Sequence, residues 1–231
     1  MLFHSVSFLI AAALLPPLVL ILAVYLLDKQ EREPAPLLWG LFFRGVLAMV
    51  PILVLELVAT QFVEFFYWRP IVYLFLSYFV IPGFIEEGIK YRVLRRRVWH
   101  DPNFNYLFDG VVYAVFVSLG FAAVENILYV LTSGFSTAVV RAIFSIPGHA
   151  MFGIVMGIRL SQAKWAQQHG QREQEEAALR KAWLMPAILH GTYDFLLVAF
   201  GWLFYLYFFL LVIYVGASLY RAAKTDGPMR I

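Results

Sequence analysis

The chain of 231 residues contains no cysteine and few charged residues. The lack of cysteine excludes disulfides, thiolate metal sites and cysteine nucleophiles. Charged residues make up 14% of the chain and hydrophobic residues 62%, whereas soluble domains are roughly a quarter charged and about half apolar. A soluble fold of this length could not bury so many Leu, Phe, Val and Tyr side chains, so the solvent around them must be lipid.

Hydropathy divides the chain into about seven apolar stretches, each of about the 20 residues that a helix needs to cross a bilayer. The stretches are continuous and not alternating, which disfavours the strands of a barrel. The sequence therefore predicts an all-α polytopic membrane bundle formed by one domain, residues 1–231. The expected spans are Phe3–Leu27, Leu37–Gln61, Pro70–Tyr91, Asp109–Leu131, Val139–Leu160, Trp183–Phe200 and Trp202–Tyr220.

Basic residues gather in alternate connections between these spans. Of the 18 Lys and Arg residues, 15 lie in residues 29–32, 90–97, 159–181 and 221–230. The positive-inside rule then predicts a multi-pass protein of the cell membrane, with its N-terminus outside and its C-terminus in the cytoplasm. The same asymmetry accounts for the pI of about 9.1, so no nucleic-acid partner is expected. Within the cytoplasmic part, the hydrophilic residues 161–182 are expected to form a connector with a short surface helix.

The third span carries two adjacent acids, Glu86 and Glu87, after a Pro82-Gly83 pair. Lys90 lies one helical turn beyond both acids, so it can neutralise one carboxylate while the other faces the bundle interior. A Pro-Gly pair interrupts the backbone hydrogen bonds, which a membrane tolerates only where protein or water satisfies the freed groups. The alternative is a plain membrane boundary, with these charges among the lipid headgroups.

Two further spans contain polar residues at depth. Glu125 and Asn126 lie in an otherwise apolar helix with no cation one turn away, so Glu125 needs a partner from another helix or a proton. His149 follows a second Pro-Gly pair in the fifth span. Ionisable groups in the hydrocarbon cost a few kcal/mol each, which makes them functional candidates. An interhelical hydrogen bond is the structural alternative for both.

The sixth span contains His190 and Asp194, which share one helix face because they are four residues apart. An imidazole and a carboxylate at this spacing suit a pair of metal ligands, or a base with its orienting acid. They also suit a plain hydrogen bond. A compact site that joins all these residues requires tilted or kinked helices, because they differ in depth.

Three of these groups together resemble a known family. Glu86-Glu87-x-x-Lys90, Phe121-x-x-x-Glu125 and His190-x-x-x-Asp194 are similar, in this order, to the EExxK, FxxxE and HxxxD motifs of the PrsW-type intramembrane proteases. The acidic, proline-bearing segment 28–34 is similar to that family as well. The family is related to the CAAX prenyl protease and abortive-infection proteases, and to the scaffold subunit of γ-secretase. The resemblance implies hydrolysis of a peptide bond in a membrane-anchored protein, of which an anti-sigma factor is the best-known example.

An activated water is the expected nucleophile, because the chain has no cysteine and no Ser or Thr stands beside a His in these motifs. In one version Glu86 or Glu87 is the general base, and His190, oriented by Asp194, holds the water or the oxyanion. In the other version zinc or another divalent metal is bound. Its expected ligands are His190, Asp194 and Glu125, together with His149. The supporting residues in either version are Lys90, Phe121, Glu125, Asn126 and His149.

Two other classes of function fit the same pattern. A small secondary transporter uses buried acids in broken helices, although this chain is short and has no inverted repeat. A non-catalytic scaffold would use the polar cluster to hold helices together. Neutralising Glu86 distinguishes the three classes, because only a protease loses a cleavage product. Arg44, within the second span, is expected to pair with an acid or to reach the membrane boundary.

Overall fold

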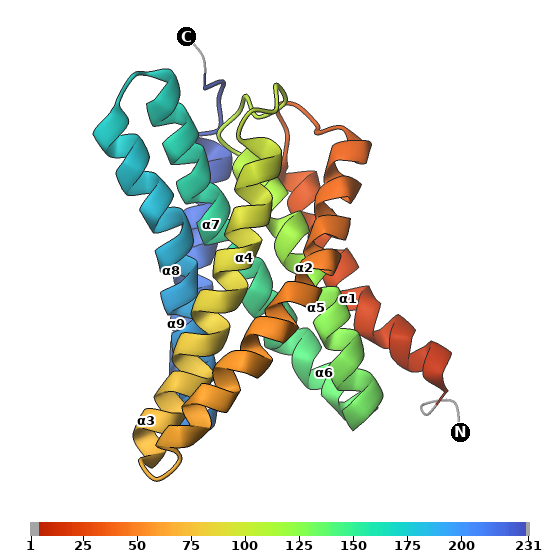
Figure 1. Ribbon diagram of the computed structural model, residues 1–231. Helices are drawn as coiled ribbons and strands as arrows, with labels where there is room; N and C mark the ends of the chain where they lie inside the picture. The colour runs from red at the N-terminus through yellow and green to blue at the C-terminus, as the bar shows by residue number, and fades with distance from the viewer. Residues whose placement is uncertain (1–4, 230–231) are drawn as a thin grey trace.

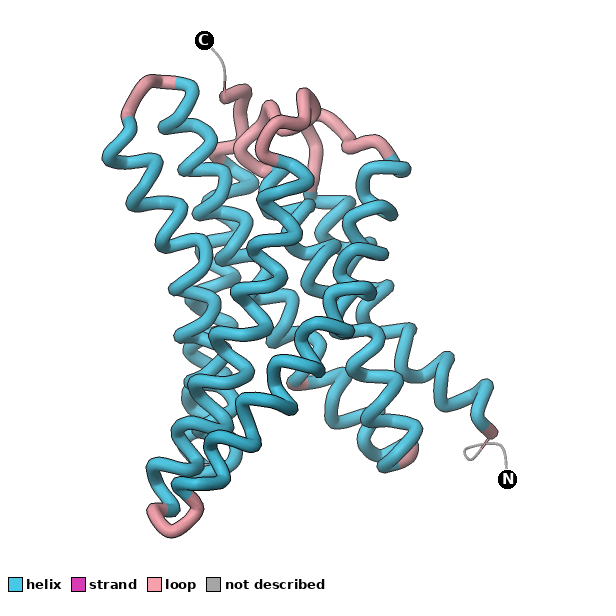
Figure 2. Tube along the Cα trace, viewed as in Figure 1, coloured by secondary structure: helices cyan, strands magenta, loops and turns pink. Residues whose placement is uncertain are grey.

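The computed structural model describes residues 5–229, which form helices joined by loops and turns, with no strand in that range (Figures 1 and 2). Seven helical runs among these residues are long and apolar enough to cross a membrane, which confirms the all-α polytopic bundle. The predicted start of the first span, Phe3, lies outside the described residues. The elements are α1 (Val6–Leu27), α2 (Ala35–Val63), η2 (Glu64–Phe66), α3 (Pro70–Phe75), η3 (Leu76–Val80), α4 (Ile81–Val98), α5 (Asp109–Ser133), α6 (Phe135–Ile143), α7 (Ser145–Gln168), α8 (Arg172–Ala199) and α9 (Gly201–Lys224).

The apolar residues that give the chain its composition cover the outside of the bundle. Large apolar side chains such as Leu47, Phe62 and Trp202 are mostly exposed, as expected of a surface that faces lipid. The central helix is α5, where 78% of the apolar window is buried, and Figure 1 shows it surrounded by its neighbours. The centre of the bundle is therefore the part of the molecule that is shielded from lipid.

Both Pro-Gly pairs coincide with an interruption of a helix, as the sequence predicts. The π-helical segment η3 ends immediately before α4, whose second residue is Pro82. Helices α6 and α7 separate at Phe144, three residues before Pro147. Proline has no N–H to donate to the preceding turn, so a wider turn or a break relieves the lost hydrogen bond. The interruptions lie shortly before Glu86 on α4 and His149 on α7.

The connector between the fifth and sixth spans differs from the expected short surface helix. Helix α7 continues to Gln168 and α8 begins at Arg172, so residues 161–182 form the tip of a helical hairpin. Gly170 makes the turn with φ +69°, a conformation that glycine adopts readily. The Gln, Glu, Arg and Ala residues of this segment are good helix formers. They extend both helices beyond the apolar spans.

Most of the basic residues lie in the helix ends and connections at one end of the bundle. Figure 1 shows the end of α9 on this side of the bundle and the start of α1 on the opposite side, as an odd number of spans requires. Which end faces the cytoplasm remains a prediction of the positive-inside rule. Arg44 donates a hydrogen bond to the carbonyl of Gly40 at 3.1 Å and is exposed, and no salt bridge joins it to an acid in residues 5–229.

Helices α4 and α8, which carry two of the three motifs, pack backbone against backbone. A Cβ atom on Gly83 of α4 would lie 2.5 Å from the carbonyl oxygen of Ala187 on α8, and one on Gly191 of α8 would lie 2.3 Å from that of Phe79 in η3, the segment directly before α4. Real side chains do not fit at such distances. The two glycines therefore set how closely Glu86 and Glu87 can approach His190.

Replacing Gly191 with alanine is expected to destabilise the protein by about 2 kcal/mol, because the added methyl group forces the two helices apart. The melting temperature of the detergent-solubilised protein is the measurement. The matched control is Gly216→Ala in α9, where nothing lies within 4 Å of the added Cβ. Equal melting temperatures for the two variants would contradict the contact.

Candidate active site

The three charged residues of the first motif form one buried ion cluster on α4. The Nζ atom of Lys90 donates to Glu86 Oε2 at 2.9 Å and to Glu87 Oε1 at 2.8 Å. All three side chains are buried. They project from the inner face of α4, because positions 86, 87 and 90 lie within one turn of each other. The ammonium group is thus the nearest counter-charge for two adjacent carboxylates.

The second pair comes from α8, at the position where this helix packs on α4. The Nδ1 atom of His190 lies 3.0 Å from Glu87 Oε1 and 3.9 Å from Glu86 Oε2. The Nε2 atom on the other side of the ring lies 3.2 Å from Asp194 Oδ2. His190 is therefore held between an inner glutamate and an outer aspartate, and Asp194 is the more exposed of the two.

His149 of α7 occupies a corresponding position. Its Nδ1 atom lies 3.4 Å from Lys90 Nζ, and its Nε2 atom lies 2.9 Å from Glu125 Oε2 on α5. Each of the two imidazoles thus turns Nε2 towards an outer carboxylate and Nδ1 towards the charges on α4. A carboxylate that accepts the Nε2 proton leaves the Nδ1 lone pair free to bind a proton or a metal.

Aromatic rings enclose the cluster. Phe121 lies 4.0 Å from Lys90 Nζ, measured to the ring centroid, and contacts His149 edge to face. Phe152 stacks on His190 with 4.7 Å between the ring centroids. Phe121 and Glu125 are one turn apart on α5, which explains the second motif: the ring covers the ammonium group and the acid holds the imidazole. These rings keep water away from the charges and strengthen their interaction.

Residues that the sequence separates by more than a hundred positions meet at this point. One donor atom from each of Glu86, Glu87, His149 and His190 lies within 4.8 Å of the other three. We call this set the inner cluster. Asp194 and Glu125 lie on its outer side, as the partners of the two imidazoles. All the candidate residues therefore belong to one site, in two layers.

Arg141 of α6 is a member of the site that the three motifs do not include. Its Nη2 atom donates to Glu125 Oε2 at 2.8 Å and its Nε atom to Asn126 Oδ1 at 2.8 Å. The amide of Asn126 donates in turn to the carbonyl of Ala13 on α1 at 2.7 Å. The missing partner of Glu125 is therefore an arginine on the short helix before the break at Phe144. The sequence signal that could have identified Arg141 is its position inside the predicted span Val139–Leu160.

Glu56 of α2 is a second residue that the motifs did not include. Its carboxylate is half-buried and interacts electrostatically with Glu86 and Glu125, and with Lys90 and His190. An acid in the middle of an apolar span is the same signal that identified Glu125. The site is thus bordered by α2 as well as by α4, α5, α7 and α8.

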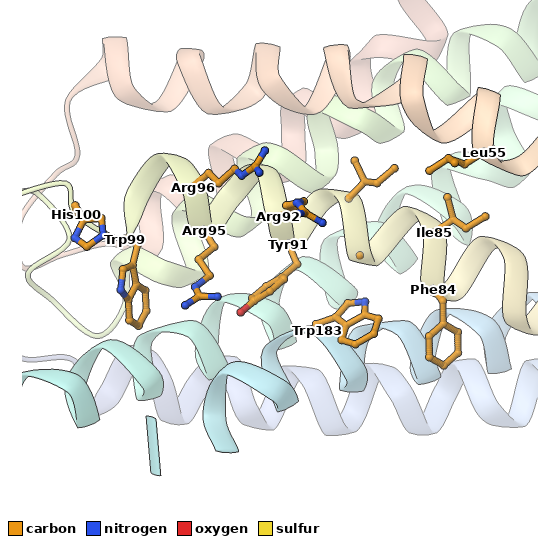
Figure 3. Close-up of a pocket in the computed structure, with 12 residues that line it drawn as sticks. Leu55, Phe84, Ile85, Tyr91, Arg92, Arg95, Arg96, Trp99, His100 and Trp183 are labelled. Atoms are coloured by element: carbon orange, nitrogen blue, oxygen red, sulfur yellow. The ribbon is translucent and has the colours of Figure 1, made fainter. Parts of the chain in front are cut away.

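A groove on the surface of the bundle lies elsewhere. It has a volume of about 770 Å³, and its lining residues include Phe84, Ile85 and Gly88 of α4 and Trp183 of α8. Figure 3 shows the arginines at positions 92, 95 and 96 along one part of it and apolar side chains along the rest. None of the inner cluster lines this groove, because residues 86, 87 and 90 project from the opposite face of α4.

A comparison with family models matches residues 33–218 to the family described as "PrsW family intramembrane metalloprotease". The chain belongs to this family. It is 35% identical over 223 residues to "Protease PrsW" of Geobacillus kaustophilus (strain HTA426), covering 96% of this chain and 94% of that protein. It is 32% identical over 224 residues to "Protease PrsW" of Bacillus subtilis (strain 168), covering 96% and 98%.

A further relative, "Protease PrsW" of Shouchella clausii (strain KSM-K16), is 37% identical over 193 residues, which cover 84% of this chain and 85% of that protein. No solved structure matches the chain. Membership of the PrsW family makes this protein a hydrolase that acts on peptide bonds and an integral multi-pass membrane protein. The resemblance that the three motifs indicate is confirmed.

The Arg141 contact leads to a prediction about stability. Replacing Arg141 with methionine leaves Glu125 with His149 alone, so we expect a loss of about 3 kcal/mol, as when one partner of a buried ion pair is removed. Arg141→Lys should retain part of the stability, because it keeps the charge but loses the second donor. Melting temperatures in detergent measure both effects.

Arg44→Met is the matched control for Arg141→Met, because Arg44 is exposed and bonds only a backbone carbonyl. If both methionine variants melt at the wild-type temperature, Arg141 does not stabilise Glu125.

Proposed function

We propose that this PrsW-family protease hydrolyses a peptide bond of a membrane-anchored protein with a water molecule activated by Glu86. The observation that carries the proposal is the convergence of two carboxylates and two imidazoles within 4.8 Å in the interior of a membrane bundle. Peptide hydrolysis requires a base for the water, and groups that stabilise the oxyanion and protonate the leaving amine. The inner cluster and its outer partners contain candidates for each role.

Glu86 is the better candidate for the general base of the two adjacent glutamates. Its side chain is 7% exposed and that of Glu87 is 0% exposed. Only Oε2 of Glu86 is engaged by Lys90, so Oε1 can accept a proton from water. Glu87 Oε1, in contrast, is shared by Lys90 and His190. We therefore assign Glu87 to the positioning of these two side chains.

His190 and Lys90 supply the positive side of the site. His190 lies between Glu87 and Asp194, and each of these carboxylates can accept a hydrogen bond from one ring nitrogen. With both nitrogens protonated, the ring can hold the developing oxyanion or return a proton to the leaving amine. Lys90 keeps the charge of the two glutamates nearly balanced while the proton moves. Asp194 orients the imidazole of His190.

The residues of the inner cluster also fit a divalent metal, which the family description implies. Two imidazoles and two carboxylates are a donor set typical of zinc sites. The buried Glu87 Oε2 has no hydrogen-bond partner, and each imidazole directs Nδ1 inward because an outer carboxylate engages Nε2. Zinc bound by His149, His190 and a glutamate would lower the pKa of a bound water and polarise the peptide carbonyl. The identity of the metal is part of the proposal.

A membrane-anchored substrate can reach the cluster only from its outer side. Asp194 and Glu125 are 27% and 19% exposed in their side chains, whereas the inner residues are almost fully buried. Water and an extended peptide segment would approach along these two acids and Glu56. A membrane-anchored regulator such as an anti-sigma factor belongs to this class of substrate, as the resemblance implies.

Neutralising the base should abolish cleavage without unfolding the protein. We expect Glu86→Gln to lower the cleavage rate by at least about 100-fold, because a general base contributes that much or more. Glu87→Gln and His190→Ala should also lose activity. The measurement compares protein N-termini by mass spectrometry in membranes that contain wild-type or variant protein at matched folded levels. New termini in or near a membrane span should be present only with active enzyme.

Glu176→Gln is the control, since Glu176 is an exposed residue of the hairpin. Identical termini with folded wild type and Glu86→Gln would contradict the assignment of the base. Loss of transport without any change in termini would support a carrier instead. Loss of folded protein in every variant would support a scaffold.

Metal removal gives an independent test of the inner cluster. We expect the purified protein to contain about one zinc or other transition metal per chain, and the double variant His149→Ala, His190→Ala to lose it. Elemental analysis of purified protein measures the content. A chelator specific for transition metals should stop cleavage, and added zinc should restore it. Metal-free protein that cleaves normally in the chelator would support the metal-free version with Glu86 and His190.

A further inference from the structure

A second group of acids lies at the end of the bundle where the basic residues gather. Asp28 caps the C-terminus of α1, Glu33 lies in the connection to α2, and Asp109 is the first residue of α5. One carboxylate oxygen from each lies within 4.8 Å of the other two. The three residues are only 2%, 4% and 0% exposed, respectively. We call them the boundary acids.

The surrounding structure holds two of these acids in place. Asp109 Oδ2 accepts hydrogen bonds from the backbone N–H groups of Asn105 at 2.9 Å and Tyr106 at 2.7 Å. Glu33 Oε2 accepts one from the hydroxyl of Tyr113. Each of these contacts uses one oxygen of its carboxylate. The directions of the two side chains are therefore set by ordinary protein contacts, and further acceptor capacity remains.

The remaining acceptor capacity of the boundary acids is not satisfied by the protein. Both oxygens of Asp28 and the Oδ1 atom of Asp109 are buried and have no hydrogen-bond partner. None of the salt bridges within residues 5–229 includes any of the three. Buried carboxylates are normally paired with a cation or hydrogen-bonded, because their desolvation is otherwise too costly. Arg32 acts on Asp28 electrostatically but forms no salt bridge with it, so no cation of the described residues contacts the group directly.

We propose that Asp28, Glu33 and Asp109 bind a divalent cation of the hard, oxygen-binding class, Mg²⁺ or Ca²⁺. The donor set consists of oxygen only, which these cations prefer, and contains no imidazole. The site is separate from the inner cluster: Asp109 begins α5, and Glu125 follows it about 24 Å further along the same helix. The proposal does not depend on the proposed catalytic roles.

A cation at this position would join segments that are distant in the sequence. It would connect the end of α1, the start of α5 and the segment between α1 and α2. The C-terminal segment lies against the same place, because Asp226 Oδ1 accepts from the N–H of Phe108 at 3.0 Å and Met229 donates to the carbonyl of Asn105 at 2.7 Å. The acidic, proline-bearing segment 28–34 would then have a structural role, cation binding through Asp28 and Glu33, that is separate from peptide hydrolysis.

Asp28→Asn is the sharpest test, because neither oxygen of Asp28 makes a hydrogen bond that the substitution would break. Wild-type and variant protein, purified in detergent, are melted in EDTA and then with MgCl₂ or CaCl₂. We expect the cation to raise the wild-type melting temperature by about 5 °C, and the variant by much less. In EDTA, Asp28→Asn should melt at or above the wild-type temperature, since it removes repulsion between the acids.

Glu31→Gln is the matched control. Glu31 is an exposed neighbour that accepts from Asn105 Nδ2 and is not one of the boundary acids, so the variant should respond to the cation like wild type. Titration calorimetry should show a saturable site whose affinity falls at least tenfold in Asp28→Asn. Comparing MgCl₂ with CaCl₂ identifies the preferred ion. A cation response that persists unchanged in Asp28→Asn, or no response in wild type, would overturn the proposal.

Discussion

The ammonium group of Lys90 makes the rest of the site possible. Removing an ion from water costs several kcal/mol even after the protein relaxes, and α4 buries two neighbouring carboxylates inside a membrane bundle. Lys90 contacts both at less than 3 Å from the same helix, so the compensation is already present when α4 forms. Phe121 covers the remaining face of the ammonium group. Without this pairing, two adjacent glutamates at this depth would have to be protonated or face water.

Two series of polar contacts extend from this centre to the edge of the bundle. His190 connects Glu87 to Asp194, and His149 connects the neighbourhood of Lys90 to Glu125. Arg141 ends the second series on α6. Each of these side chains therefore supplies a hydrogen-bond or ion-pair partner for a polar group on another helix. The packing of five helices around the site and the balance of its charge are consequences of the same contacts.

The boundary acids differ from the inner cluster, because no salt bridge within the described residues balances their charge. Burial, together with the charge of Asp226, raises the pKa of Asp28 to about 6. Burial likewise raises the pKa of Glu33 to about 7. Such groups oppose folding at neutral pH, since the folded protein must take up protons or hold unpaired charge. A fold that retains them at this position needs a compensating partner there.

Sequence alone predicted the helical class, the seven spans and the residues of the three motifs, because hydropathy and residue spacing along a helix are local properties. Glu86, Glu87 and Lys90 were therefore accessible as one unit. Arg141 and Glu56 were missed as site residues because their importance depends on which helices become neighbours, and no spacing along one helix reveals that. The same holds for the two layers of the site: only packing brings Asp194 and Glu125 to the outer nitrogens of two imidazoles.

The helical content of residues 161–182 was predicted too low, because hydropathy indicates where the lipid ends and not where a helix ends.

The close contact at Gly191 and Gly83 has a consequence for how the enzyme tolerates different membranes. Where backbone packs on backbone, no side chain can change its rotamer to let the helices move closer. The contact therefore sets a minimum distance between His190 and the two glutamates. A thinner or thicker bilayer must therefore be accommodated by tilt or by deformation elsewhere, as in the lipid-exposed outer part of α2. The reactive groups keep their spacing while the lipid-facing helices adapt, which makes the chemistry insensitive to the thickness of its surroundings.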